Sequence, residues 1–394
     1  MSEHSFLVVS HDVPRPDQTS GDLRFFKLLD LLARRGTVSF YSIDQTTDVE
    51  RQAAERKLKD VGVTIRRGTF SHVMRERRFD VVMFELYFVA RDLIDVARTW
   101  QPKARIVVDS VDVHFHRLGS KARLTGMAAD AAHARAVRND ELTVYRRADL
   151  VVTVSDDDKR VIESQGVRCP VAVLPNIHEM APLARSAVSG KLELIFIGSY
   201  KWAPNVDAML YFCSAVMPLL RGRVPAVRLR IVGSGPTPEI QALAGDDIEV
   251  VGYVEDTAPF LASSHISVAP LRYGGGIKGK IGEAQAHGLP VVTTPVGAEG
   301  FGFEIGRDVL VADSALAFAD AVVALWQDPS LYESVRRHGW DFIHSRYSIE
   351  AVSMKIPAFV DAVMDTKPKR VPTLKRLRTL APHMYARHVA WRFR

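Results

Sequence analysis

The stretch Pro270-Leu-Arg-Tyr-Gly-Gly-Gly-Ile-Lys-Gly-Lys-Ile-Gly-Glu-Ala-Gln-Ala-His-Gly-Leu-Pro-Val-Val292 decides the fold of this chain. It leaves an apolar run, passes through a glycine-rich turn into a segment with helical spacing, and ends in a second apolar run. Strand, turn, helix and strand in this order are typical of a parallel sheet covered by helices on both faces. The glycine turn allows close backbone approach to an anion and Lys278 and Lys280 add positive charge, so it is a candidate phosphate site.

Apolar runs of strand length alternate with helical segments along the whole chain. They lie at 6–10, 38–43, 80–84, 105–109, 150–154 and 171–174, and again at 192–198, 228–233, 248–252, 266–269, 290–293 and 309–311. Each half therefore has enough strands for its own doubly wound sheet, and the predicted fold class is α/β. The polar segment 175–190 is the expected linker, which gives domains 1–180 and 181–347. A further helix is expected over about 348–365, starting at Ser348.

The composition excludes several classes of protein. The 394 residues are 47% hydrophobic and 25% charged, which fits two globular cores and not a mainly disordered or fibrous chain. Two cysteines without zinc-type spacing favour a reducing compartment, the cytoplasm. The start of the chain has no basic segment before a long apolar run, and no run approaches about 18 apolar residues. We therefore expect neither a signal peptide nor a membrane span.

The positive charge is concentrated at the end of the chain. The net charge is +6, and the basic residues after Asp365 exceed this whole excess: Lys367, Lys369, Arg370, Lys375, Arg376, Arg378, Arg387, Arg392 and Arg394. Apolar side chains are interleaved with them, so residues 366–394 are expected to form a basic amphipathic tail. One hypothesis is contact with an anionic membrane surface. The alternative is a tail that packs on the body or stays solvated.

Three more loops of the second half follow predicted strands, where open parallel sheets bind ligands. In 198–206, Pro204 marks a helix start beside Lys201, which suits a diphosphate, but Trp202 could simply pack and Lys201 be solvated. Segment 252–256 would meet a base edge or form an ordinary turn. Segment 295–300 allows close approach to a ligand or a tight turn. Glu283, a turn into its helix, suits the vicinal hydroxyls of a ribose.

Two loops of the first half are candidates on the opposite side. Gly21 ends the loop 16–21 before a helix and would admit a phosphate or a sugar, or is a plain loop glycine. Segment 109–117 follows a strand, and Asp112 and His114 would share one side of an extended chain. These side chains suit acid–base or other polar chemistry. The alternative is that the histidines are hydrogen-bonded loop residues.

Two segments partly match other phosphate-binding motifs. Residues 274–281 match G-x-x-x-x-G-K, but Ile281 stands where a P-loop needs a hydroxyl for magnesium. Residues 233–238 begin like a dinucleotide fingerprint, but Pro238 replaces its third glycine. Both a P-loop NTPase and a nicotinamide enzyme are therefore disfavoured.

Motifs along the chain resemble those of the retaining glycosyltransferases with GT-B architecture, in particular their family-4 group. They are G-S-x-x-W-x-P-N at 198–205, I-V-G-S-G-P at 231–236, G-G-x-K-x-K-x-x-E-A-x-A-x-G-L-P-V-V at 275–292, and T-T-P-x-G-A-E-G at 293–300. Looser matches are P-R-P-D-x-x-S-G at 14–21 and D-x-x-D-x-H at 109–114. The resemblance thus spans nearly the whole chain before the tail.

The resemblance implies two facing Rossmann-like domains with a cleft, the first binding the acceptor and the second a nucleotide-sugar donor. His114 matches a first-domain histidine that faces the donor sugar, and Lys201 and Lys280 are the candidate charges for the leaving diphosphate. Many relatives have a glutamate where this chain has Gly275, eight residues before Glu283. The donor-binding set is Gly21, Gly198, Gly252, Tyr253, Val254, Gly276, Ile277, Lys278, Gly279 and Glu283.

The predicted reaction is hexosyl transfer from a nucleotide-diphosphate sugar to an acceptor hydroxyl, with retention and with the leaving phosphate as base. No metal or other cofactor is expected, and no nucleic-acid partner. The acceptor is expected to be a saccharide or lipid-linked, in surface polysaccharide or glycolipid synthesis, with the protein cytoplasmic or peripheral on the inner face of the membrane. The alternatives are a sugar-nucleotide epimerase of the same architecture and a non-catalytic nucleotide-sugar binding module.

Overall fold

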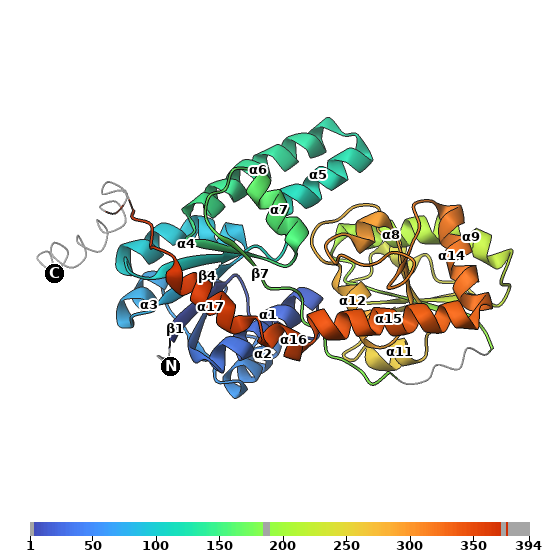
Figure 1. Ribbon diagram of the computed structural model, residues 1–394, viewed down its shortest axis with the longest axis horizontal. Coiled ribbons are helices and arrows are strands. Elements are labelled where there is room, and N and C mark those ends of the chain that lie inside the picture. The colour runs from blue at the N-terminus through green and yellow to red at the C-terminus, as the bar shows by residue number, and fades with distance from the viewer. Residues whose placement is uncertain (1–3, 184–189, 372–375, 377–394) are drawn as a thin grey trace, which may run out of the picture.

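The computed structural model describes residues 4–183, 190–371 and 376, which form two α/β domains side by side (Figure 1). The sheet of the first domain is, in spatial order, β3 (Thr64–Arg66), β2 (Gly36–Ser42), β1 (His4–Ser10), β4 (Val81–Glu85), β5 (Arg105–Asp109), β6 (Leu150–Thr153) and β7 (Val171–Val173). The second sheet is β10 (Ile248–Gly252), β9 (Arg228–Val232), β8 (Glu193–Ile197), β11 (Ile266–Ala269), β12 (Val291–Thr293) and β13 (Leu310–Val311).

All neighbouring strands pair in parallel. The strand order reverses between β1 and β4 and again between β8 and β11, the points where doubly wound sheets open a crevice for a ligand. The α/β prediction and twelve predicted strand positions are confirmed, whereas β3 was missed. Its three residues, Thr-Ile-Arg, are too short and too polar to stand out as an apolar run.

Helices cover both faces of each sheet. The first domain has α1 (Ser20–Ala33), α2 (Val49–Asp60), α3 (Phe70–Glu76), α4 (Tyr87–Trp100), α5 (His114–Thr125), α6 (Ala128–Arg147) and α7 (Asp156–Ser164). The second has α8 (Ala203–Tyr211), a π-helical turn (Phe212–Val216), α9 (Met217–Arg221), α10 (Pro238–Gln241), α11 (Ala258–Ala262), α12 (Gly279–Ala286), α13 (Pro295–Ala298), α14 (Ala315–Gln327) and α15 (Pro329–Tyr347). Hydroxyl side chains cap several helix starts, as Thr19 does for α1.

Alternate side chains of the central strands build a core on each face of the first sheet. Leu7 and Val9 lie in the cluster with side chains of α4 and α6. Phe6 and Val8 lie in the opposite cluster with side chains of α1. This two-sided burial explains why β1 reads as a continuous apolar run, and it fixes the register of the strand ends that border the ligand crevice.

The chain crosses between the domains twice at one place. The linker reaches the second domain through His178, whose N–H donates to the carbonyl of Tyr347 at 2.8 Å, at the end of α15. Ser348 then caps α16 (Ile349–Ser353), and α17 (Ile356–Asp365) buries Phe359 and Val363 in the core of the first domain (Figure 1). The predicted helix start at Ser348 is confirmed, and the segment 348–365 is two helices.

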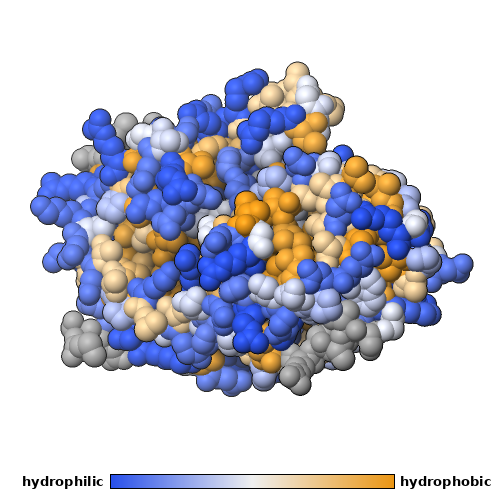
Figure 2. Space-filling view, turned by 45° about the vertical axis from the view of Figure 1, so that its right-hand side comes forward, coloured by the Kyte–Doolittle hydropathy of each residue, from blue (hydrophilic) through white to orange (hydrophobic). Residues whose placement is uncertain are grey.

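One described run, Ala203–Arg221, is long and apolar enough to cross a membrane by length and composition alone. Its side chains Met209, Phe212, Val216 and Leu220 lie in the core of the second domain, which is how a core helix passes the same test. On the face in Figure 2, hydrophobic side chains form separate groups bordered by hydrophilic ones.

Of the tail, residues 366–371 and 376 are described, so the membrane hypothesis concerns residues 372–375 and 377–394, outside the described part. The backbone N–H of Lys369 donates to Asp149 Oδ1 at 2.9 Å, and its ammonium donates to the carbonyl of Ala148 at 2.5 Å. Because Asp149 immediately precedes β6, these contacts fix the start of the tail at the amino ends of the strands, away from the ligand crevice.

Candidate functional site

A cavity of about 960 Å³ lies between the two domains. Its walls come from loops that follow β1, β4 and β5 in the first domain and β8, β9, β10 and β11 in the second. Every site residue predicted from the sequence lines it except Gly252.

For Gly252 the prediction needs correction. It has φ +80° at a register shift between β10 and β9, and its carbonyl accepts a hydrogen bond from the N–H of Gly233 at 2.7 Å. Glycine tolerates this conformation, in which the chain leaves the strand and Tyr253 and Val254 reach the cavity wall.

Three helices begin at the cavity wall. The first residues of α1, α8 and α12 line it, including Ser20, Pro204 and Gly279. A β-carbon on Gly279 would collide with the Ser20 side chain, so only glycine lets the two helix starts meet across the cleft. The unpaired N–H groups of the first turns and the positive ends of the helix dipoles favour an anion here.

Lys280 is a partly buried cation in the wall of the cavity. Its ammonium donates to Asn205 Oδ1 at 2.5 Å and lies 4.8 Å from the centre of the Phe196 ring. Burial, with the nearby charge of Lys278, lowers the pKa of Lys280 to about 7. An amide oxygen and a ring face are weak partners for a partly buried ammonium, so an anionic ligand would improve its surroundings.

The Lys278 side chain contacts the glycine turn and Glu299, whereas the sequence predicts that its charge serves a phosphate. Its ammonium donates to the carbonyl of Gly276 at 2.8 Å and lies 3.4 Å from Glu299 Oε2. Burial lowers its pKa below the ordinary lysine value. Lys278 therefore holds the glycine turn in shape, and Glu299 offsets part of its charge.

The loop between β8 and α8 is fixed by a buried asparagine that the sequence analysis missed. Asn205 Nδ2 donates to the carbonyl of Ser199 at 2.8 Å while its oxygen accepts from Lys280. The P-N pair at the predicted helix start was its only sequence signal. Pro204 lies in the first turn of α8, as predicted. The stem of Lys201 packs against Gly235, where a β-carbon would lie 3.2 Å from Lys201 Cγ.

Glu283 is held by a neighbouring loop. The Thr257 hydroxyl donates to Glu283 Oε1 at 2.6 Å, and burial raises the pKa of this carboxyl group. Among the described residues, none donates to its other oxygen, which is free to accept from a ligand hydroxyl. Nearby, the Tyr253 hydroxyl donates to Asp17 Oδ2 at 2.9 Å across the cleft.

His114 is the first residue of α5 and packs edge-on against the rings of Tyr87 and Phe88. Its Nδ1 lies 3.0 Å from the carbonyl oxygen of Asp112, so Nδ1 carries the proton and Nε2 is the acceptor. Burial lowers the pKa of His114, which favours the neutral ring. The Glu141 carboxylate accepts from the backbone N–H of His114 at 3.1 Å and thus caps α5.

Two residues at this edge of the first sheet have left-handed backbone conformations that the sequence did not indicate. Leu86 follows β4 with φ +70°, and Val111 follows β5 with φ +52°. Both line the cavity. Such conformations are costly for residues with bulky side chains, above all for β-branched valine, and they tend to concentrate at functional sites.

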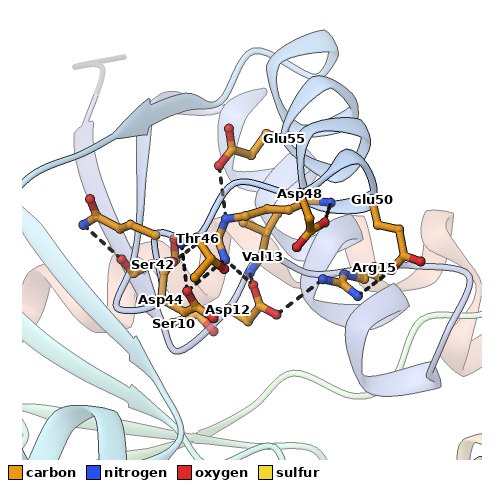
Figure 3. A network of polar contacts seen from close by, with 12 residues as sticks. Ser10, Asp12, Val13, Arg15, Ser42, Asp44, Thr46, Asp48, Glu50 and Glu55 are labelled. Carbon is orange, nitrogen blue, oxygen red and sulfur yellow. Dashed lines mark hydrogen bonds and ion pairs between the residues drawn. The ribbon is translucent and has the colours of Figure 1, made fainter.

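Arg51 of α2 holds the first-domain loop between β1 and α1. Its guanidinium donates to Asp12 Oδ1 at 2.7 Å and lies 3.5 Å from Glu55 Oε1. Arg15 of the same loop pairs with Glu50 Oε2 at 2.9 Å. Figure 3 shows their partners Asp12, Glu50 and Glu55, and Arg15 itself, gathered between the loop and α2. The network fixes the loop that carries Asp17 to the cleft and leads into α1, whose second residue is Gly21.

The P-loop alternative fails on packing. Ile281, which stands at the position of the magnesium-binding hydroxyl, is fully buried in an apolar cluster of the second domain. A P-loop needs an exposed hydroxyl there.

Comparisons with known proteins agree with this architecture. Residues 191–328 match the family model of glycosyl transferases group 1. A Klebsiella pneumoniae protein, described as an uncharacterized 44.6 kDa protein in the cps region, is 22% identical over 392 residues, which cover 89% of this chain and 98% of that protein.

Two solved structures have a similar fold. The Anabaena protein Alr3699/HepE, in complex with UDP-glucose, gives a TM-score of 0.68 at 12% identity, covering 91% of this chain and 99% of that one. Sucrose-phosphate synthase from Thermosynechococcus elongatus gives a TM-score of 0.69 at 16% identity, covering 91% of this chain and 98% of that one.

Two parallel-sheet domains around a cleft give the chain the GT-B fold. Its second domain carries the match to the glycosyl transferases group 1 family, and the resemblance to that family seen in the sequence is confirmed.

Proposed function

We propose that this protein is a retaining glycosyltransferase that moves a hexosyl group from a nucleotide-diphosphate sugar to an acceptor hydroxyl. The observation that carries the proposal is the partly buried, weakly partnered Lys280 in the wall of an interdomain cavity, at the starts of α8 and α12. This arrangement suits a diphosphate, whose negative charge grows as the sugar bond breaks.

In the proposed complex the donor lies along the second-domain wall. The free oxygen of Glu283 accepts from the ribose hydroxyls, and the loop at Tyr253 and Val254 borders the base. Lys201 and Lys280 neutralise the diphosphate. The sugar then lies over the glycine turn 274–276, opposite His114, whose Nε2 is oriented to accept from a sugar hydroxyl.

The acceptor enters from the first-domain side in this proposal. A leaving phosphate oxygen takes the proton of the attacking hydroxyl, the new bond forms on the face that the diphosphate leaves, and the anomeric configuration is retained. Lys201 and Lys280 supply the positive charge that a metal ion supplies in other enzymes, so no metal step is included.

The biological setting is proposed from one relative and from the tail. The Klebsiella protein is described as lying in a cps region, which supports a role in surface polysaccharide synthesis. A lipid-linked acceptor at the inner face of the membrane would explain a basic tail, on a cytoplasmic and peripheral protein. Removing residues 372–394 keeps the Lys369 contacts and should weaken binding to anionic vesicles. Unchanged vesicle binding would end the membrane proposal.

Donor binding tests the central proposal. Calorimetry and thermal shift with UDP-, GDP-, ADP- and dTDP-hexoses should find one selectively bound class, because a ligand of the folded state raises its stability. Glu283→Ala should weaken that binding about tenfold or more, whereas the fully exposed Glu239→Ala should not. If no sugar nucleotide binds the wild-type protein, the proposal is wrong.

Product analysis separates the alternatives. A transferase forms product only with an acceptor, and NMR of the new linkage reports retention. An epimerase converts the donor without any acceptor, and a binding module binds the donor without converting it. Saccharide and lipid-linked acceptors from surface polysaccharide pathways are the substrates to screen.

A further inference from the structure

The carboxylate of Asp112 has two oxygens in different situations. Oδ2 accepts a hydrogen bond from Arg117 Nε at 2.5 Å. Oδ1 is buried, and no group in the described part of the chain donates to it. Burying an oxygen of a charged group without a hydrogen-bond partner costs desolvation free energy, and this cost is offset when a ligand donates to it.

Oδ1 lies where the first domain touches the glycine turn of the second. A β-carbon on Gly275 would lie 2.6 Å from Asp112 Oδ1 and 2.8 Å from Arg117 Cβ, so only glycine permits this approach. Asp112 and residues 274–276 line the same wall of the cavity. No side chain of the turn therefore extends into the region that this oxygen borders.

The position of Asp112 is fixed from several directions. Val111, with φ +52°, directs the chain into a tight turn in which the N–H of Asp112 donates to the carbonyl of Ser110. The carbonyl of Asp112 accepts from His114 Nδ1. Arg117, its ion-pair partner, also lies 4.5 Å from the centre of the Trp202 ring of the second domain. A carboxylate held this firmly is preorganised for a ligand.

We propose that Asp112 Oδ1 accepts a hydrogen bond from a hydroxyl group of the transferred sugar and so determines donor specificity. The inference rests on the proposed function. It assigns sugar recognition to a carboxylate of the first domain, reaching across the cleft to the place where Gly275 leaves the second domain without a side chain. The preferred donor carries a hydroxyl at this position, and a donor that is deoxygenated there binds poorly. Entry of the hydroxyl requires the domains to part slightly at the Asp112–Gly275 contact.

The test compares a nucleotide sugar with its own nucleoside diphosphate. Isothermal titration calorimetry measures UDP and UDP-glucose, GDP and GDP-mannose, ADP and ADP-glucose, and dTDP and dTDP-glucose on the full chain. For the pair that binds, Asp112→Asn should weaken the sugar nucleotide about 10- to 100-fold and change the diphosphate less than about twofold. The control is Asp130→Asn, a partly exposed carboxylate outside the cavity wall that pairs with Lys121 at 2.9 Å on the same helical hairpin.

Deoxy donors identify the contact itself. The wild-type protein should bind one of the 2-, 3-, 4- and 6-deoxy analogues more weakly than the parent sugar nucleotide, by the same factor as Asp112→Asn loses for the parent. The Asp112→Asn variant should bind that analogue as tightly as it binds the parent sugar nucleotide. Asp112→Ser, which is smaller and uncharged, repeats the test, and thermal unfolding verifies that each variant is folded.

The outcomes distinguish two failures. If the wild-type protein binds a sugar nucleotide but both Asp112 variants lose affinity equally for it and for the diphosphate, or lose none, the inference is wrong while the proposed function stands. The inference is also wrong if, for every deoxy donor, the loss of binding free energy caused by removing the hydroxyl adds to the loss caused by Asp112→Asn. If the wild-type protein binds none of these ligands, the proposed function fails and the inference falls with it.

Discussion

Arg24, which is buried, and Lys280, which is partly buried, are cations at the carboxyl edges of their sheets, yet their surroundings differ. Arg24 donates to both oxygens of Asp109, at 2.7 and 3.2 Å, and to the carbonyl of Leu174. Lys280 has one amide oxygen and the face of a ring. The Arg24 charge is satisfied by Asp109 within the fold, whereas among the described residues Lys280 has no carboxylate at ion-pair distance, and Glu283 acts on it only from farther away. We infer that Arg24 stabilises the first domain and that Lys280 is reserved for an anionic ligand.

Breaking the Arg24 pair should have the largest effect. Arg24→Met leaves Asp109 buried without its partner, so the free energy of unfolding should fall by about 3–5 kcal/mol in urea denaturation followed by circular dichroism. Arg24→Met/Asp109→Leu should recover part of this loss, because both buried charges are then removed. The exposed pair of Arg307 with Glu304 supplies the control, and Arg307→Met should lower the free energy of unfolding only slightly. If Arg24→Met and the exposed-pair control lost equal free energy of unfolding, the Arg24 pair would contribute no more to stability than a surface pair does.

Lys280→Met should increase the stability of the protein, whereas Arg24→Met decreases it. Transfer activity should fall about 100- to 1000-fold, because the leaving diphosphate loses a preorganised charge. The free energy of unfolding at pH 7 should rise by about 1–4 kcal/mol, because a poorly partnered, partly buried ammonium is replaced by an apolar side chain. The exposed Lys191→Met is the matched control for both assays. A Lys280→Met protein that is active, or markedly less stable, would place Lys280 with Arg24 as a structural residue.

The pH dependence of activity and of stability tests the same difference between Lys280 and Arg24. Burial and Lys278 lower the pKa of Lys280 to about 7, so its protonated fraction falls above that pH. The kcat/KM for the donor should then fall about tenfold per pH unit, and Lys280→Arg, which stays charged, should flatten this limb. For stability, the folded chain binds fewer protons than the unfolded chain between pH 7 and the ordinary lysine pKa of 10.5. The stability gain of Lys280→Met should therefore be full below pH 7 and vanish above about pH 10.5. An unchanged limb in Lys280→Arg would exclude Lys280 as the titrating group.

The smallest effect is expected at the hydrogen bond between Tyr253 and Asp17, which crosses the cleft between the two domains. Tyr253 is 51% exposed, so its 2.9 Å bond to Asp17 is worth about 0.5–1 kcal/mol. Tyr253→Phe should raise the KM for the donor at most about fivefold and leave kcat within about twofold. Tyr211→Phe, whose ring lies outside the cavity wall, is the comparison. A large fall in kcat would assign Tyr253 a role in the reaction itself.

Much of the fold could be predicted because its signals are local. Runs such as Leu192–Gly198 show their apolar character within a few residues, and glycine-rich turns between strand and helix are visible at once. The candidate site followed from the same property, since in parallel sheets the loops after the strands meet at one edge. Strand β3 was missed because its three residues carry no such signal.

The contacts that give the site its chemistry could not be predicted in the same way. Asn205 lies 75 residues from Lys280 in the sequence, and Arg24 lies 85 residues from Asp109. The conformation of Val111 also has no local sequence cause, because valine disfavours a positive φ. Such features arise when distant segments pack, and the free energy that fixes them is distributed over both cores.

Residue 275 shows the division most clearly. By itself, the sequence determined two α/β domains, the loops that border their cleft and the absence of a carboxylate at Gly275, because these depend on short-range patterns. Tertiary structure alone decided that Gly275 lies against Asp112, that Lys280 is partly buried with a weak partner, and that Lys278 faces Glu299. These are consequences of how two separate cores meet, since burial and partner geometry set the charge state and hydrogen-bonding capacity of each group.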